Sequence, residues 1–254
     1  MKIPEKTRLV QFRTTKGGRA KATFLLTGMP GNGKTTLAAC LLKRLISSQS
    51  DEDILGIDFP EEDEGIRTVS DRDIMFATVK DIESLDELYT HAVGMKPKGI
   101  LLDGLPAAWK MFFAARCAGL TMPNDNGKTW NTLATDLTSR LIVRFKDIPS
   151  VESFIAVSTV WPDKDEATGD EKRLQATLPG QLKGNIYGLF SYCFNIKVAE
   201  AQGKSIRTLE TQPDAKVVAK MRAPLGANIQ KNILYDLNDA KLGIDYLVAK
   251  LGLV

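Results

Sequence analysis

The sequence predicts an α/β fold. Short apolar runs alternate along the chain with stretches of helical periodicity, and the first such pair is joined by a glycine-rich loop. A later apolar run ends in an aspartate, and another ends in two hydroxyl residues. This alternation is typical of βαβ units. The 254 residues contain no strong linker, so we expect a single domain (1–254), made of an N-terminal arm or hairpin (1–20), a core (21–225) and a C-terminal extension (226–254).

The composition excludes several classes of protein. A hydrophobic content of 43% and a charged content of 26% are ordinary for a soluble domain, and no apolar run approaches the ~20 residues of a membrane helix. The first residues lack a signal-peptide pattern, so we expect no membrane association and a cytoplasmic location. The three cysteines are far apart and predict free thiols. A net charge of +3 permits nucleic-acid binding but does not argue for it.

The glycine-rich loop carries the most specific motif in the chain. G-x-x-x-x-G-K-T runs from Gly28 to Thr35, between the apolar run 24–26 and a helix that begins near Lys34. This context predicts a phosphate-binding P-loop rather than a plain glycine turn, with ATP and Mg²⁺ as cofactors. Lys34 should reach the β- and γ-phosphates, and the Thr35 hydroxyl should bind Mg²⁺. The predicted nucleotide-binding residues are Gly28, Met29, Pro30, Gly31, Asn32, Gly33, Lys34, Thr35 and Thr36.

The apolar run 100–103 ends in an aspartate and matches the Walker B pattern. Asp103 is therefore expected to belong to the Mg²⁺ site together with Thr35. The next residue is Gly104, whereas several ATPase classes place a catalytic glutamate there, so the catalytic base must come from elsewhere. The acidic loop after the strand expected at 54–57 offers Asp58, Glu61 and Glu62, although a solvated acidic loop fits the same residues.

The remaining elements follow from periodicity and turn residues. Strands are expected at 8–13, 54–57, 74–79, 153–160 and 192–198, with a hairpin of 207–210 and 216–219; helices are expected at 82–94, 130–145, 182–190 and 237–251. Residues 105–128 are interpreted as a long connection and 161–178 as a polar, flexible segment. Ligands bind beyond the carboxyl ends of parallel strands, so Ser158 or Thr159 could sense the γ-phosphate; a strand-end hydroxyl bonded to the backbone is the equal alternative.

In the order of its motifs, the chain resembles phage-type nucleotide-binding proteins of the RecA-like P-loop ATPase superfamily, and in particular phage recombination ATPases that anneal single strands. The resemblance covers about residues 20–225. The stretches that carry it are 28–36, 100–103, 129–146, 158–159, 178–184, 188–190, 211–214 and 219–222. It implies a twisted, mostly parallel sheet flanked by helices, with a C-terminal β-hairpin and helix.

The resemblance also implies a set of roles. ATP would be hydrolysed at an interface between subunits of a homo-oligomer, with a base taken from the strand that ends at Asp58, where we favour Glu61. Lys220 and Arg222, two residues apart on one strand face, would reach the neighbouring subunit's γ-phosphate. The segments 105–128 and 162–178 would contact single-stranded DNA and stimulate hydrolysis. Their basic residues are Lys110, Arg116, Lys128, Lys164, Lys172 and Arg173.

These features predict a DNA-stimulated ATPase that acts on single-stranded DNA in phage recombination or replication, in the cytoplasm of the host cell. Two alternatives stay open. A small-molecule or nucleoside kinase would suit the Met29-Pro30-Gly31 loop, but the arginine-rich lid of a kinase is not evident at 161–178. A nucleotide-dependent assembly factor with little turnover would suit the weak signal for a catalytic base.

Overall fold

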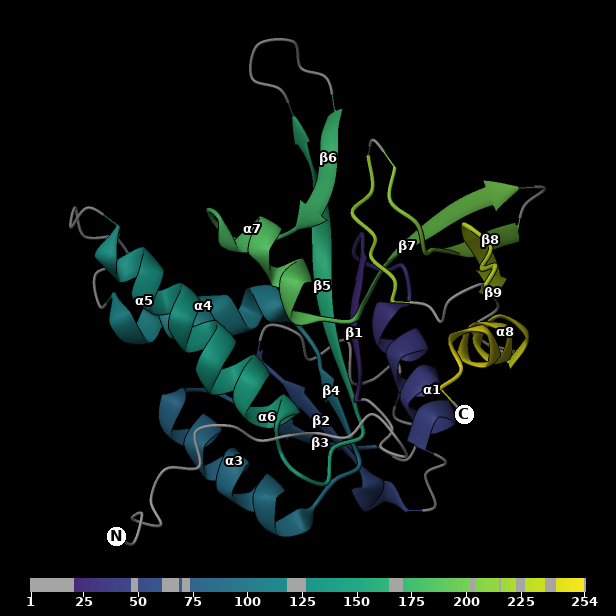
Figure 1. Ribbon diagram of the computed structural model, residues 1–254. Helices are drawn as coiled ribbons and strands as arrows, with labels where there is room; N and C mark the ends of the chain where they lie inside the picture. Colours follow the sequence, from purple (N-terminus) through teal and green to yellow (C-terminus); the bar gives the residue numbers. More distant parts are fainter. Residues whose placement is uncertain are drawn as a thin grey trace, which may run out of the picture.

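The computed structural model describes residues 21–46, 50–60, 69, 74–117, 127–164, 171–201, 204–214, 216–222, 227–235 and 241–253. Across these residues, nine strands form a sheet in which six neighbouring strands, starting from one edge, are parallel (Figure 1). In sheet order the parallel strands are β3 (Met75–Thr78), β2 (Ile54–Asp58), β4 (Gly99–Leu102), β5 (Ser153–Lys164), β1 (Ala22–Gly28) and β7 (Tyr192–Ala201). The predicted α/β fold with a mostly parallel sheet is confirmed.

Three antiparallel strands complete the sheet. β8 (Lys204–Glu210) pairs with β7, β9 (Asn232–Tyr235) pairs with β8, and β6 (Glu171–Ala176) pairs with the end of β5. The helices are α1 (Lys34–Ile46), α3 (Ile82–Met95), α4 (Leu105–Arg116), α5 (Lys128–Asp136), α6 (Arg144–Lys146), α7 (Leu182–Asn185) and α8 (Lys241–Leu251). Shorter turns are the 3₁₀ segments η1 (Asp51–Asp53) and η4 (Ile186–Leu189) and the π-helical segment η3 (Leu137–Val143).

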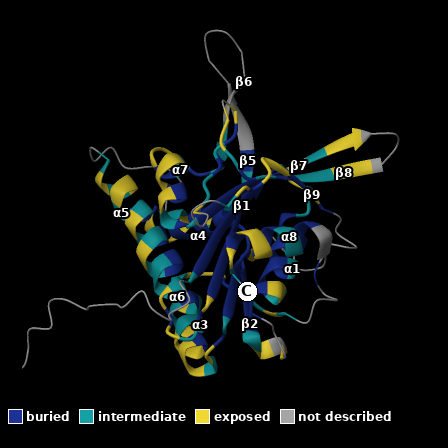
Figure 2. Ribbon diagram, turned by 45° about the vertical axis from the view of Figure 1, so that its right-hand side comes forward, coloured by how far each residue is buried: buried dark blue, intermediate teal, exposed yellow. Residues whose placement is uncertain are grey.

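The helices cover both faces of the sheet, and two apolar cores lie between them and the strands (Figure 2). Side chains alternate between the two faces of a strand, so each buried strand contributes side chains to both cores. In β4, Ile100 and Leu102 pack with α3, α4 and η3, whereas Leu101 packs with α1 and α8. Because both faces are covered, the apolar residues of β4 and of the middle of β1 and β5 follow one another without alternation.

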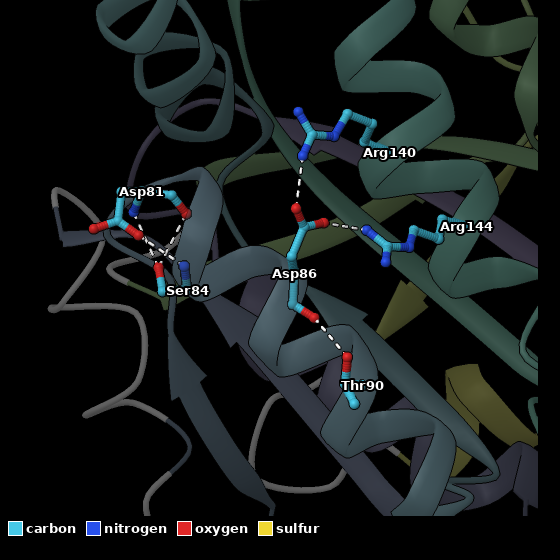
Figure 3. Close-up of polar contacts among 6 residues, drawn as sticks. All are labelled: Asp81, Ser84, Asp86, Thr90, Arg140 and Arg144. Atoms are coloured by element: carbon cyan, nitrogen blue, oxygen red, sulfur yellow. Dashed lines mark hydrogen bonds and ion pairs between the residues drawn. The ribbon is translucent and has the colours of Figure 1, made fainter.

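A salt-bridge cluster joins α3 to the long helix formed by α5, η3 and α6 (Figure 3). Asp86 on α3 receives hydrogen bonds from the guanidinium groups of Arg140 and Arg144. The bond from Arg144 is the main reason why the pKa of Asp86 lies below its ordinary value. Arg144 also lies 3.8 Å from the centre of the Tyr89 ring. The helix predicted at 130–145 is confirmed, and these contacts determine which of its faces lies against α3.

Two segments that we expected to be loops are regular structure. Residues 105–116 form α4, which carries buried Leu105, Ala108 and Phe112 at helical spacing and a proline in its first turn. The prediction of an unbroken connection over 105–128 was therefore wrong for this part, while 118–126 lie outside the described residues. Residues 162–164 and 171–176 belong to β5 and β6, so most of the segment 162–178 is an antiparallel strand pair.

The C-terminal hairpin is present but uses other strands than those predicted. β8 pairs with β7 rather than with 216–219. Val217 makes a parallel bridge to Leu174, and Lys220 an antiparallel bridge to Cys193. The turn at 212–214 therefore directs the chain toward β6 and then β7 instead of folding it onto β8. The strand predicted at 8–13 and residue Glu61 lie outside the described residues.

The C-terminal extension is tied to the core through α8. Ile244 and Leu247 of α8 pack in the same core as Leu37 and Leu41 of α1. Gly243 lies where α8 crosses β9: an added Cβ atom would lie 2.7 Å from the carbonyl oxygen of Leu234. A backbone atom cannot yield as a side chain can, so the absence of a side chain at Gly243 sets how closely α8 approaches the sheet.

We expect Gly243→Ala to lower the free energy of unfolding by roughly 1–3 kcal/mol, because α8 must move away from β9. Urea denaturation followed by circular dichroism measures this change. Gly94→Ala is the matched control, since an added Cβ atom in α3 meets nothing within 4 Å. It should leave stability unchanged or raise it by up to about 1 kcal/mol through helix propensity. Equal stability of the two variants would contradict the close contact.

Candidate functional site

The glycine loop lies between β1 and α1, at the carboxyl edge of the parallel sheet. Gly31 and Gly33 have φ values of 77° and 80°, a region in which glycine carries no steric penalty. α1 begins at Lys34, so its first backbone N–H groups have no carbonyl partner within the helix and point toward the loop. Such a loop at a helix N-terminus favours an anion through both hydrogen bonds and the helix dipole.

Lys34 lies over this loop. Its side chain is only 8% exposed, and its ammonium group donates a hydrogen bond of 2.9 Å to the carbonyl oxygen of Met29. The contact places a positive charge beside the N–H groups at the start of α1. A phosphate held there would meet the charge and the backbone donors together, as the sequence predicts for Lys34.

The loop is held in position by the neighbouring strand β7. Gly28 lies opposite Ile196, and an added Cβ atom on Gly28 would be 2.7 Å from the Ile196 carbonyl oxygen. The side-chain amide of Asn32 donates a hydrogen bond of 2.8 Å to the same oxygen. One carbonyl group of β7 therefore fixes both the first residue of the loop and its middle.

Thr35 and Asp103 come together across two different elements. The Thr35 hydroxyl donates a hydrogen bond of 2.9 Å to a carboxylate oxygen of Asp103, which is 2% exposed. A hydroxyl and a carboxylate are oxygen ligands of the kind that Mg²⁺ prefers, and Mg²⁺ usually keeps several waters and needs few protein groups. These two residues fit the predicted Mg²⁺ site, and they would hold the ion between α1 and the end of β4.

Asp58 is the second buried carboxylate at this edge. It ends β2, which pairs with β4, and its side chain has no solvent exposure. Ile57 and Leu102, the residues before Asp58 and Asp103, both pack in the core opposite α1. By strand alternation the two carboxylates point toward the α1 face, where the glycine loop lies. Glu61, the favoured candidate base, lies outside the described residues, so Asp58 is the candidate whose position is known.

β5 brings Thr159 level with the loop. Thr159 lies opposite Gly28, whereas Ser158 is fully buried and its hydroxyl donates to the Thr159 carbonyl oxygen at 3.1 Å. That carbonyl also accepts hydrogen bonds from the backbone and side chain of Thr177. Of the two candidate sensors, Ser158 is thus bonded to the backbone, and Thr159 keeps partial exposure beside the loop.

Lys220 and Arg222 do not share one environment. The Lys220 ammonium donates hydrogen bonds to the carbonyl oxygens of Tyr187, at 3.2 Å, and Phe190, at 2.8 Å. Lys220 forms an antiparallel bridge with Cys193, and Cys193 pairs with Leu25 in the middle of β1. Lys220 is therefore not level with the glycine loop of its own chain, which follows the last residue of β1. Arg222 is exposed and forms no ion pair with another described residue. Lys220 therefore has a structural partner within the chain, and Arg222 is the cation available to another molecule.

A chain of polar side chains beside the loop had no place in our sequence-based predictions. The Thr27 hydroxyl shares its proton between the Phe194 carbonyl oxygen, at 3.2 Å, and the Asn195 amide oxygen, at 3.3 Å. The Asn195 amide nitrogen donates to Glu210 at 2.6 Å. The relevant sequence signal is a single asparagine within the apolar strand 192–198. The contacts of this asparagine depend on the pairing of β7 with β1 and β8, which sequence periodicity does not reveal.

Other features of the described residues agree with a site built around the loop. No group of three or more histidine, cysteine, aspartate or glutamate side chains forms a separate metal site in the part of the chain that the structure describes. Cys40, Cys117 and Cys193 are free thiols, as predicted, and burial raises the pKa of Cys193 to about 12. None of the described helices is long and apolar enough to cross a membrane.

The fold and the loop define a P-loop nucleotide-binding protein. The chain belongs to a family described as an AAA domain (AAA_24), whose model matches residues 20–223. No curated protein matches the sequence. Among solved structures, the flagellar accessory protein FlaH from Methanocaldococcus jannaschii is 12% identical, with 87% of each chain covered and a TM-score of 0.50. A KaiC-like protein from the hyperthermophilic archaeon Pyrococcus horikoshii OT3 is 16% identical, with 88% of this chain and 90% of that chain covered and a TM-score of 0.46.

We expect Asp103→Asn to remove the tightening of ATP binding by Mg²⁺, because the amide keeps the shape of the side chain but loses its negative charge. Titration calorimetry should show at least about tenfold weaker binding of ATP with Mg²⁺ and little change for ADP without the metal. Asp147→Asn, an exposed aspartate beyond α6, is the control. An unchanged Mg²⁺ dependence in Asp103→Asn would exclude Asp103 from the metal site.

Proposed function

We propose that this protein is an ATPase that binds ATP with Mg²⁺ and acts on single-stranded DNA in phage recombination or replication, as a single domain in the cytoplasm of the host cell. The observation that carries the ATPase proposal is the bond between Thr35 and Asp103 beside the Lys34 ammonium. It brings an anion-binding loop and a pair of Mg²⁺ ligands to one edge of the sheet. Membership of the AAA domain family supports the same activity.

In the proposed mechanism the chain positions charge rather than forming covalent bonds. The backbone N–H groups of the loop, except at Pro30, which has none, and the Lys34 ammonium would hold the phosphates. Thr35 with Asp103 would hold Mg²⁺, which would supply positive charge to the phosphates. A carboxylate, either Asp58 at the end of β2 or Glu61 further along the chain, orients a water molecule and accepts its proton. The oxygen of this water forms a bond to the γ-phosphorus while the bond from the γ-phosphorus to the bridging oxygen breaks, which gives ADP and phosphate. Thr159 senses the γ-phosphate.

The proposal that the protein binds DNA rests on the family resemblance and on the elements beyond the carboxyl edge of the sheet. The β5–β6 pair and the β7–β8 pair extend beyond the carboxyl edge (Figure 1). On the helical side, Trp130 is 37% exposed and stacks on Trp109 with ring centres 5.5 Å apart. Exposed aromatic rings near basic residues are a common way to bind single strands. The segments 105–128 and 162–178 thus remain our proposed DNA contacts, with α4, β5 and β6 as their framework.

We also propose that the ATP site is completed by a neighbouring subunit of a homo-oligomer. Arg222, the second residue of the Lys220 and Arg222 pair, supports this proposal. An arginine supplied by another subunit stabilises the charge on the transferred phosphoryl group. Lys220 would support Arg222 indirectly, because its ammonium group ties the preceding segment to Tyr187 and Phe190. The pair then consists of one positioning residue and one residue that reaches the neighbour.

We expect phosphate release from ATP to rise when single-stranded DNA is added. A coupled phosphate assay, run with and without an oligonucleotide at constant salt, measures this directly. Lys34→Ala should be inactive in both conditions, which excludes a contaminating ATPase. A rate that does not respond to DNA, together with phosphorylation of a nucleoside or another small-molecule acceptor, would overturn the proposal in favour of a kinase.

We expect Arg222→Ala to bind ATP normally but to lose hydrolysis. Mixing it with Lys34→Ala should restore part of the activity, because the first variant keeps an intact loop and the second keeps the arginine. Lys250→Ala, which alters an exposed lysine in the last turn of α8, is the control and should retain hydrolysis by itself. If the mixture stays inactive although the variants assemble together, Arg222 does not act on a neighbour.

A further inference from the structure

A cavity of about 640 Å³ opens beside the glycine loop, on the side of β7. Met29 and Asn32 of the loop form one wall, and residues 195–198 of β7 with Glu210 form another. Asp214 and Val217, from the turn that follows β8, line a third side. The volume lies within the range of about 300–1,000 Å³ that is usual for small-molecule sites, and the walls combine apolar surface with a few polar groups.

The sheet order determines which part of a nucleotide this cavity would meet. The predicted metal ligand Asp103 follows β4, and the strands run β4, β5, β1, β7 across the sheet. Mg²⁺ bridges the β- and γ-phosphates, so the terminal phosphates belong on the β4 side of the loop. The rest of the nucleotide must then leave the loop on the opposite side. That side is β7, where the cavity lies.

A buried polar side chain presents a carboxylate to this cavity. Asn195 is 4% exposed, accepts a hydrogen bond from Thr27 and donates one of 2.6 Å to Glu210. Both Asn195 and Glu210 line the cavity. A carboxylate has four lone-pair positions, and the bond from Asn195 uses one, so Glu210 can accept further hydrogen bonds. The hydroxyl groups of a ribose are donors of the required kind.

We propose that this cavity binds the ribose and base of the nucleotide, and that Glu210 accepts hydrogen bonds from the ribose hydroxyls. The proposal rests on the ATPase function above and adds to it the side chain that recognises the ribose. The role of Asn195 is to hold Glu210, because its amide is anchored through Thr27 to β1, the strand that leads into the loop. Lys197 and Lys216 also line the cavity, and Asp214 forms an ion pair of 3.2 Å with Lys231.

Three probes separate the parts of the ligand: ATP, 2′,3′-dideoxy-ATP and inorganic tripolyphosphate, each with Mg²⁺. Binding is measured by titration calorimetry on the full chain, with no need for turnover. Wild-type protein should bind ATP at least about tenfold more tightly than the dideoxy analogue, because hydrogen bonds to a charged group are lost in the latter. In Glu210→Gln this preference should fall several-fold, while the affinity for tripolyphosphate stays unchanged.

Glu200→Gln is the matched control, since Glu200 lies on the same strand pair but is exposed and does not line the cavity. It should behave as wild type with all three probes. Equal binding of ATP and the dideoxy analogue by wild-type protein, or an unchanged preference in Glu210→Gln, would overturn the assignment of Glu210. Failure of wild-type protein to bind both ATP and tripolyphosphate would instead overturn the proposed function itself, so the two failures are distinguishable.

Discussion

The close approach of Gly28 to the carbonyl group of Ile196 is the constraint on which the site depends. β1 lies between β5 and β7, and its last residue has no room for a side chain on the side of β7. The same carbonyl receives the Asn32 amide. Because both contacts involve one peptide group, the position of the loop is set by the register of β1 with β7. The register of β1 with β5 places Thr159 on one side of the loop, and the cavity lies on the other side, along β7.

The second determinant is a pair of buried carboxylates on neighbouring strands. Asp58 and Asp103 end β2 and β4, and both are almost completely removed from solvent. Burying two like charges close together is costly unless positive charge is supplied. The Lys34 ammonium and a bound Mg²⁺ would both supply it at this edge. A ligand that binds only the folded chain stabilises it, so ATP with Mg²⁺ should raise the stability of the protein.

Much of this arrangement could be predicted because local sequence patterns determine it. The glycine loop needs a strand before it and a helix after it, and both are visible in residues 24–46. The apolar strand before Asp103 is equally clear. α4 was missed because its apolar residues, among them Trp109, Phe112 and Phe113, are too closely spaced for one clean helical stripe. It packs between the sheet and α5, so more than one of its faces is buried.

The parts that could not be predicted depend on pairing between distant segments. β8 alternates well enough to join either 216–219 or β7, and only the sheet shows that β7 is its partner. The same holds for Lys220, whose spacing from Arg222 suggests a common role although its ammonium group is bonded to Tyr187 and Phe190. Asn195 and Glu210 are also far from the loop in sequence and reach it only through β7 and β8.

The most direct test of the account is an equilibrium titration of wild-type protein and Lys34→Ala with ATP and Mg²⁺. If the loop from Gly28 to Thr35 is the phosphate site, wild-type protein should bind one ATP per chain, and Lys34→Ala should bind at least about tenfold more weakly. Lys80→Ala, which alters an exposed lysine before α3, should bind as wild type does. Equal affinity of wild-type protein and Lys34→Ala would contradict the assignment of the loop.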